Sequence, residues 1–394
     1  MTNKPSSPTN YGSIRQMEIY LSGLSGKTPE IPISPDELEL RAKEVMRPEA
    51  YDYVAGGAGG EDTMRANLEA FKRWRMVPKM LRDVAVRDLS VEILGNSLPA
   101  PVFVAPVGVQ GIIHPDCEIA VAKAAASLNI PMILSTVSST PMEAVAEANG
   151  NSVRWFQLYW PRDPNLAASF ISRAERAGYS AIVVTLDTHT LGWRERDLQR
   201  AYLPFLQAMG MANYISDPVF RAALPRPPEE DTESAVRHWL TLYSKPEMQW
   251  NALSWLREKT KLPILLKGLQ HPDDSARALD CGMDGIIVSN HGGRQVDGAV
   301  ASLDALPPIV KRIDSRIPIL FDSGIRRGAD AYKALALGAN AILLGRPYLW
   351  GLAVAGEQGV REVLLNFLAD LDLTMAMSGC ASLAEIDGSA LVRE

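Results

Sequence analysis

The chain has 394 residues, of which 47% are hydrophobic and 22% charged, and its formal net charge is −6. These values are typical of an ordinary globular protein with a sizeable core, and the acidic balance gives no overall attraction to nucleic acid or to an anionic membrane. The three cysteines lie far apart and outside any Cys-x-x-Cys pair, and the five histidines show no metal-ligand spacing, so neither a disulfide framework nor a metal site is indicated.

The two ends of the chain carry no recognisable targeting signal. The N-terminal segment MTNKPSSPTNYG lacks the apolar stretch of a signal peptide, the C-terminal LVRE is not an address signal, and no run of 18 apolar residues occurs. We therefore expect a cytoplasmic protein that does not bind membranes.

Residues 1–100 are expected to form a helical extension that packs on the main domain. The segment SPDELELRAKEVM predicts a helix, with Ser34 as the N-cap residue and Glu37 completing a capping box.

Residues 101–378 contain eight short apolar runs, separated in most cases by Ala-rich helical segments that end in Gly or Asn, as helix C-termini do. The runs cover residues 101–106, 131–136, 154–159, 181–187, 263–268, 284–290, 318–324 and 340–345. Eight such alternations predict a (β/α)8 (TIM) barrel of the α/β class. An open doubly wound sheet is the alternative, but no Gly-x-Gly-x-x-Gly follows the first run.

Residues 188–262 interrupt this alternation after the fourth strand. An insertion at this point lies on the face of the barrel where such enzymes carry out their chemistry, so it is expected to form a lid; the alternative is an inert surface excursion. Residues 379–394 are expected to form a C-terminal tail.

Polar side chains stand at nearly every strand end, where a parallel barrel brings them to one mouth. They are Ser135, Thr136, Gln157, Tyr159, Thr185, Asp187, Lys267, Ser289, His291, Asp322 and Arg346. Structural roles would account for one or two of them, so the set predicts a bound polar ligand.

The loops after the last two strands, DSGIRRG and LLGRP, predict a phosphate site. Gly324 and Gly345 allow backbone N–H groups to approach an anion, and Arg326 and Arg346 supply charge. A phosphorylated substrate and a phosphate-bearing cofactor both fit. The polar groups on the earlier strands suggest a flat heterocycle, and Lys267 would place a positive charge beside it, as a reduced flavin requires.

The turn SNHGGRQVDG, at residues 289–298, sets His291 and Arg294 around a Gly pair. On its own it could be a tight turn with solvent-facing side chains. Together with the strand-end set and FDSGIRRGAD, it resembles the FMN-dependent 2-hydroxy acid oxidoreductases, over about residues 16–378. Segments such as FQLYWPRD and TLDTHTLGWRERDL are most similar to the lactate 2-monooxygenase branch.

The resemblance implies roles for individual residues. His291 would be the base that removes a proton from the 2-hydroxy acid, and Asp187 would stabilise its cation. Arg194 and Arg294 would bind the substrate carboxylate, with Tyr53 beside it, and Tyr159 would lie near the substrate hydroxyl. The FMN-binding set would be Pro106, Val107, Gly108, Ser135, Gln157, Thr185, Lys267, Ser289, Asp322, Ser323, Gly324, Ile325, Arg326, Gly345 and Arg346, with no metal.

The resemblance also implies a homotetramer or homo-octamer that uses dioxygen. The monooxygenase outcome is favoured because Gly108 would leave room near the flavin, where many oxidases have Ala; the alternative is an oxidase that releases the 2-oxo acid and hydrogen peroxide. Val137, Leu191 and Trp193 are expected to shape the rest of the pocket. Two functions of other classes stay open: a lyase or isomerase acting on a phosphorylated sugar, and a flavin-binding barrel without catalysis.

Overall fold

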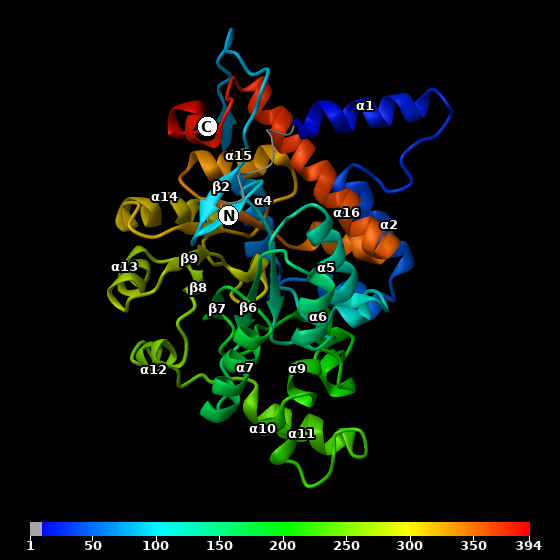
Figure 1. Cartoon of the computed structure of the whole chain (residues 1–394), viewed down its shortest axis with the longest axis vertical. Helices are drawn as coiled ribbons and strands as arrows, with labels where there is room; N and C mark the ends of the chain where they lie inside the picture. The colour runs from blue at the N-terminus through cyan, green and yellow to red at the C-terminus, as the bar shows by residue number, and fades with distance from the viewer. Residues whose placement is uncertain (1–9) are drawn as a thin grey trace.

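Eight parallel strands close into a barrel in the order β10-β11-β4-β5-β6-β7-β8-β9 (Figure 1). The computed structural model describes residues 10–394. The strands are β4 (Val102–Val104), β5 (Met132–Ser135), β6 (Arg154–Leu158), β7 (Ile182–Thr185), β8 (Ile264–Leu269), β9 (Gly285–Val288), β10 (Ile319–Phe321) and β11 (Ala341–Leu344). All eight predicted strands are present, and the closed sheet confirms the (β/α)8 barrel over the open alternative.

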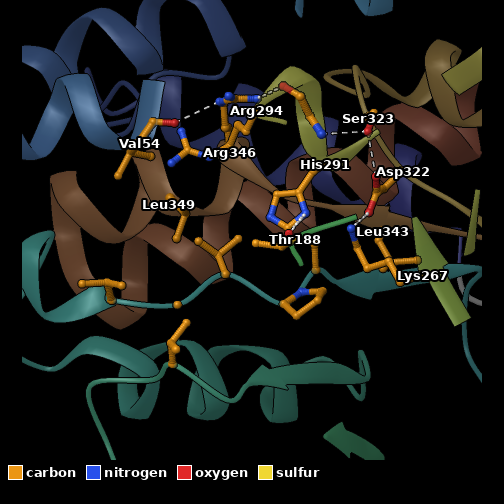
Figure 2. A pocket seen from close by; sticks show the side chains of 18 of the residues that line it. Val54, Thr188, Lys267, His291, Arg294, Asp322, Ser323, Leu343, Arg346 and Leu349 are labelled. Atoms are coloured by element: carbon orange, nitrogen blue, oxygen red, sulfur yellow. Dashed lines mark hydrogen bonds and ion pairs between the residues drawn. The ribbon is translucent and has the colours of Figure 1, made fainter. Parts of the chain in front are cut away.

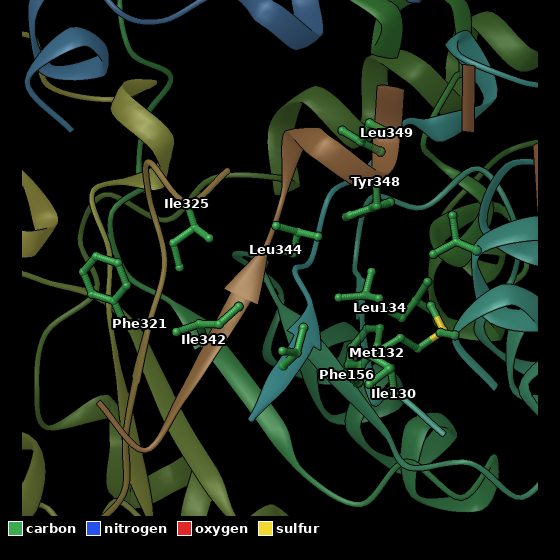
Figure 3. Close-up of a cluster of buried hydrophobic side chains, with 14 of the residues drawn as sticks. Ile130, Met132, Leu134, Phe156, Phe321, Ile325, Ile342, Leu344, Tyr348 and Leu349 are labelled. Atoms are coloured by element: carbon green, nitrogen blue, oxygen red, sulfur yellow. The ribbon is translucent and has the colours of Figure 1, made fainter. Parts of the chain in front are cut away.

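The strands are apolar on both faces because both faces are covered. Alternate residues, among them Phe103, Trp155 and Leu265, form one buried cluster inside the barrel, where the Phe103 and Trp155 rings lie 4.6 Å apart. Their neighbours belong to a second, larger cluster, which Figure 3 shows around Leu134, Phe156 and Ile342. This alternation is the filled interior and helix-covered exterior expected of a parallel barrel.

The barrel helices follow the strands in chain order. They are α5 (Cys117–Ser127), α6 (Met142–Asn149), α7 (Pro164–Arg176), α12 (Ala252–Lys259), α13 (Pro272–Asp280), α14 (Ser302–Ile313), α15 (Gly328–Ala336) and α16 (Arg346–Met377), which is kinked at Ala355 and Gly356. Asn129, Gly178, Gly282 and Gly338 have positive φ just after a helix end, which confirms the predicted Gly and Asn helix stops.

From residue 10 onward, four helices precede the barrel: α1 (Tyr11–Gly23), α2 (Pro35–Val45), α3 (Pro48–Ala55) and α4 (Asp62–Lys72). The predicted helix is α2, but the capping box is wrong, because the Ser34 side chain makes no capping hydrogen bond. Pro35 stands at the start of the helix instead, where its missing N–H costs nothing. The hairpin β2 (Val91–Ile93) and β3 (Asn96–Leu98) adds Ile93 and Leu98 to the cluster inside the barrel.

The insertion after β7 folds into short helices: α8 (Glu195–Gln199), α9 (Ala212–Ile215), α10 (Pro218–Ala222) and α11 (Thr232–Leu242). In Figure 1 the last three lie together at the lower end of the molecule. At the other end of the chain, β12 (Leu391–Arg393) pairs antiparallel with β1 (Trp74–Met76). None of the helices in residues 10–394 combines the length and apolar character that crossing a membrane requires.

A buried carboxylate in α16, that of Asp372, joins this helix to Arg87 and to the start of α1. Arg87 donates to both carboxylate oxygens of Asp372, each at 2.7 Å, and the Gly12 backbone N–H donates to the same carboxylate at 2.8 Å. Asp372 is fully buried. Burying two charges is favourable only with such complete pairing, so loss of one partner leaves the other uncompensated.

Replacing Asp372 with Ala should therefore lower the free energy of unfolding by about 3–5 kcal/mol. Urea unfolding followed by circular dichroism measures this. The control is Glu44→Gln, which removes the exposed Arg41–Glu44 pair and should cost no more than about 1 kcal/mol. Equal losses of unfolding free energy in the two variants would contradict the stabilising role of the buried Asp372.

Candidate active site

A cavity opens at the carboxyl ends of the barrel strands, and its empty volume, counted together with the open solvent at its mouth, is about 1220 Å³. Figure 2 shows part of its lining, with side chains from β8, the His291 turn, the loop after β10 and the start of α16 facing one another. Sixteen of the predicted site residues line it: Tyr53, Pro106, Val107, Gly108, Tyr159, Arg194, Lys267, His291, Arg294, Asp322, Ser323, Gly324, Ile325, Arg326, Gly345 and Arg346.

Five predicted residues do not line the cavity but lie behind it. Four are buried at strand ends: Ser135 and Gln157 are joined at 3.1 Å, Gln157 donates to Thr185 at 2.9 Å, and Lys267 donates to the Ser289 hydroxyl at 2.8 Å. These bonds orient polar groups that burial would otherwise leave unsatisfied. The fifth, Asp187, contacts His291.

The His291 imidazole lines the cavity and is held by several neighbours. Its Nδ1 lies 2.8 Å from Asp187 Oδ1 and 3.2 Å from the Thr188 hydroxyl, and its Nε2 lies 3.4 Å from the Tyr159 hydroxyl. Burial disfavours charge on Asp187, but the nearby His291 holds the pKa of that carboxyl below its usual value. An ionised carboxylate only accepts hydrogen bonds, so it selects the tautomer with the proton on Nδ1 and leaves Nε2 as an acceptor that faces the Tyr159 hydroxyl.

Burial also sets the charge of that imidazole. It lowers the pKa of His291 below its ordinary value of 6.5, and Asp187 only partly offsets the effect. Burial likewise raises the pKa of Tyr159, whose hydroxyl therefore stays protonated. The site holds a neutral base beside a neutral phenol at neutral pH.

The turn that carries His291 is left-handed at three consecutive residues, with φ of 59° at His291, 66° at Gly292 and 77° at Gly293. A Cβ on Gly293 would lie 2.7 Å from backbone atoms of Met64 in α4, and one on Gly292 would lie 2.9 Å from the Arg346 guanidinium. The Gly pair is thus required by its backbone conformation and by close packing against α4.

Two guanidinium groups are held by the C-terminal end of α3. Arg294 donates to the carbonyls of Tyr53 and Gly56 at 2.6 and 2.7 Å, and Arg346 donates to Val54 and Gly56 at 3.0 and 2.9 Å. Carbonyls at a helix C-terminus are natural partners for cations. Arg294 also lies over the Tyr53 ring, 5.2 Å from its centre.

The cavity holds more positive charge than its carboxylates balance. Among residues 10–394, no carboxylate forms an ion pair with Arg294, Arg326 or Arg346. Burial, with repulsion by Arg194, lowers the pKa of Arg294 to about 10; burial, with repulsion by Arg294 and Arg326, lowers that of Arg346 to about 9; and burial lowers that of Arg326. Desolvated cations without counterions favour anionic ligands.

The two glycines predicted to admit a phosphate differ in their surroundings. A Cβ on Gly345 would meet nothing closer than 4.0 Å, so a ligand can approach this backbone at the start of α16. A Cβ on Gly324 would lie 2.8 Å from the Asn67 carbonyl, so this glycine is needed for packing on α4.

Two expectations about the pocket walls are wrong. Trp193 does not line the cavity and is 71% exposed. The second expectation is that Gly108 leaves room near the flavin, but Val137 fills that space. A Cβ on Gly108 would lie 2.5 Å from the Val137 side chain and 2.6 Å from its carbonyl. Val137 and Leu191 do line the cavity, as predicted.

Among the lining residues that sequence reasoning missed are Thr188, Phe205 and Tyr243. Thr188 directly follows Asp187, so its place at the strand end was a usable signal. Phe205 and Tyr243 belong to the insertion, whose irregular path carries no periodic pattern that would predict which side chains face inward.

Comparison with known proteins agrees with this geometry. The model of the FMN-dependent dehydrogenase family matches residues 42–393. The chain belongs to this family. It is 44% identical over 390 residues to an FMN-dependent alpha-hydroxy acid dehydrogenase of Penicillium citrinum, covering 98% of this chain and 97% of that protein. It is also 44% identical over 376 residues to an L-lactate oxidase of Lysinibacillus sphaericus, covering 95% and 96%.

Solved structures agree with the fold. The crystal structure of a mandelate oxidase matches with a TM-score of 0.81 and 37% identity, covering 92% of this chain and 98% of that one. The predicted family is thereby confirmed, and FMN is the cofactor. The unpaired cations and the open backbone at Gly345 fit the phosphate of FMN, and Lys267, 4% exposed, fits a flavin ring that gains negative charge.

Replacing Arg326 with Met should weaken FMN binding at least tenfold, because its guanidinium donates only to the adjacent Ile325 carbonyl and has no carboxylate partner in the described chain. Titration of the apoprotein with FMN, followed by flavin fluorescence, measures this. Arg327→Met is the matched control: this exposed neighbour pairs with Asp36 on the surface and should leave the affinity within about twofold. Equal affinities for FMN in the two variants would count against Arg326.

Proposed function

We propose that this enzyme oxidises a small L-2-hydroxy acid with dioxygen. The observation that carries the proposal is the oriented pair of His291 and Asp187, 2.8 Å apart, in a cavity that also contains unpaired guanidinium groups. A 2-hydroxy acid has a carboxylate for the cations and a hydroxyl for the base. FMN, when bound, accepts the two electrons that the hydroxy carbon loses.

Each side chain has one task in this reaction. Arg294 and Arg194 bind the substrate carboxylate, for which a planar guanidinium is suited. Arg194 is itself oriented by bonds to the Arg294 carbonyl and to Gln295, at 3.1 and 2.9 Å. His291 Nε2 accepts the proton that the substrate releases, and Asp187 stabilises the resulting imidazolium. Tyr159, protonated and 3.4 Å from Nε2, directs the substrate hydroxyl toward the base.

We further propose that the 2-oxo acid is retained while dioxygen reacts, so that L-lactate and dioxygen give acetate, carbon dioxide and water. In the alternative, an oxidase, pyruvate leaves and hydrogen peroxide is released. The difference depends on how long the product stays in a closed pocket. Phe205 and Tyr243, both from the insertion, line the cavity and support retention; the absence of a methyl group at Gly108 does not, since Val137 fills that space.

Turnover of L-lactate in saturating oxygen should yield acetate and carbon dioxide in equal amounts, measured by NMR and by gas analysis. Stoichiometric pyruvate and hydrogen peroxide would establish the oxidase instead. If no 2-hydroxy acid bleaches the flavin under anaerobic conditions, the proposed reaction itself is wrong.

Replacing His291 with Asn should slow anaerobic flavin reduction by about 10²- to 10⁴-fold while FMN stays bound, because positioned proton transfer is lost. Stopped-flow absorption at the flavin band measures the rate constant. His271→Asn, a change at an exposed helix N-cap, should leave it unaltered. A rate near that of the wild type in the His291 variant would remove this residue as the base.

The pH dependence of kcat/KM should have an acid limb with a midpoint below 6.5. The reaction requires neutral His291, and burial lowers the pKa of this imidazole, so activity is kept at neutral pH and is lost only as pH falls through the lowered value. Asp187→Asn removes an influence that raises this pKa, so the limb should move to lower pH while the plateau rate falls. A limb that moves upward in this variant would contradict the arrangement.

A further inference from the structure

Ser323 has a strained backbone in the loop after β10. Its φ is 85°, in the left-handed region that a residue with a Cβ rarely occupies, and the next residue, Gly324, has φ of 96°. Glycine at position 323 would adopt this conformation without strain. Strained residues persist where the surrounding structure fixes them, and they are concentrated at functional sites.

The Ser323 hydroxyl uses its full bonding capacity. It accepts hydrogen bonds from the backbone N–H groups of Gly292, at 3.0 Å, and Asn290, at 3.4 Å, and it donates to Asp322 Oδ1 at 2.8 Å. One hydroxyl has one proton and two lone pairs, so nothing is left over. Ser323 is 8% exposed, and water has little access to replace these bonds.

These bonds belong to a closed network around the base. The other oxygen of Asp322 lies 3.1 Å from Lys267 Nζ, Lys267 donates to Ser289 at 2.8 Å, and Ser289 accepts from the His291 backbone N–H at 3.0 Å. The Ser289 and Ser323 hydroxyls therefore connect the backbone N–H groups of His291 and Gly292 to the ion pair of Lys267 and Asp322. Figure 2 shows Ser323 and Asp322 between the His291 turn and Lys267.

We propose that Ser323 is a positioning residue that holds the His291 turn in register with the pair of Lys267 and Asp322. Through its hydroxyl, the base on one side of the cavity and the cation on the flavin side form one rigid unit. The proposal rests on the proposed function, since it assigns His291 as the base. It adds that the serine hydroxyl, and not the loop conformation alone, sets where Nε2 points.

Loss of the hydroxyl has two expected consequences. The Gly292 N–H loses its acceptor, so the turn shifts and Nε2 leaves its position for proton transfer. Asp322 loses a donor, so its carboxylate pairs more closely with Lys267 and neutralises more of that charge. A less positive flavin site stabilises the reduced flavin less, so the reduction potential falls.

Ser323→Gly is the decisive variant, because it removes the hydroxyl and relieves the strained backbone. The purified holoenzyme should keep its FMN and its thermal stability. Its rate constant of flavin reduction at saturating hydroxy acid should fall 10- to 100-fold, with less than a threefold change in KM. Ser315→Gly is the matched control, at an exposed serine with φ of 58°, and should leave all of these values unchanged.

Two further readouts separate positioning from a structural role. The acid limb of the reduction rate should shift in Ser323→Gly, because the placement of His291 changes relative to Asp187, Thr188, Tyr159, Lys267 and Arg194, the groups that face it. The flavin reduction potential should fall, and this measurement needs no hydroxy acid, so it tests the network even if the proposed reaction is wrong. Ser323→Ala, which keeps the strained backbone, should behave in the same way.

The proposal is overturned if the flavin of Ser323→Gly is reduced at the wild-type rate, and if both the acid limb of that rate and the flavin reduction potential are unchanged. A variant that folds but loses FMN overturns it as well, since Ser323 would then act on cofactor binding. If the wild-type flavin is not bleached by any 2-hydroxy acid, the proposed function fails. The flavin reduction potential of Ser323→Gly then tests the hydrogen-bond network by itself: an unchanged potential overturns it.

Discussion

The site depends on an excess of positive charge gathered around one partly buried cavity. Lys267, Arg294, Arg326 and Arg346 line one cavity, in which Asp322 is the carboxylate that faces them. Helix α3, which precedes the barrel, supports this arrangement by directing its C-terminal carbonyls at two guanidinium groups. Carbonyl dipoles orient cations without neutralising them, so the charge stays available for a phosphate and a carboxylate.

Burial, and to a smaller extent the neighbouring charges, set the protonation state of the base. Lys267 and Arg194 disfavour a proton on His291, and His291 and Lys267 keep Asp187 ionised despite its burial. A neutral imidazole whose Nδ1 proton is committed to a carboxylate can accept a proton only at Nε2. Lys267 and Arg194, which add to the positive charge of the cavity, therefore also help burial to keep the base neutral.

Sequence reasoning predicted the barrel and most of the lining because parallel strands converge. Once the strand ends were known, Lys267, His291 and Asp322 had to share a mouth, and the structure brings them together. It failed where contacts are not periodic. Side chains of the irregular insertion gave no sign of direction, so Phe205 was missed and Trp193 was misplaced. The explanation for Gly108 failed because only three-dimensional packing reveals that Val137 fills the space beside it.

The insertion is attached to the barrel at more than its two ends. The buried Asn213 side chain donates to the Thr136 carbonyl at 3.0 Å and accepts from the Met142 N–H at 2.8 Å, and Asp217, also buried, pairs with Arg173 at 3.0 Å. Phe205 stacks on Trp239 at 4.7 Å, and Trp239 stacks on Tyr243 at 4.5 Å. Opening this part would expose paired charges and stacked rings together, which is costly. The aromatic side chains of the insertion that line the cavity are thus held to the barrel by buried polar contacts and to one another by ring stacking.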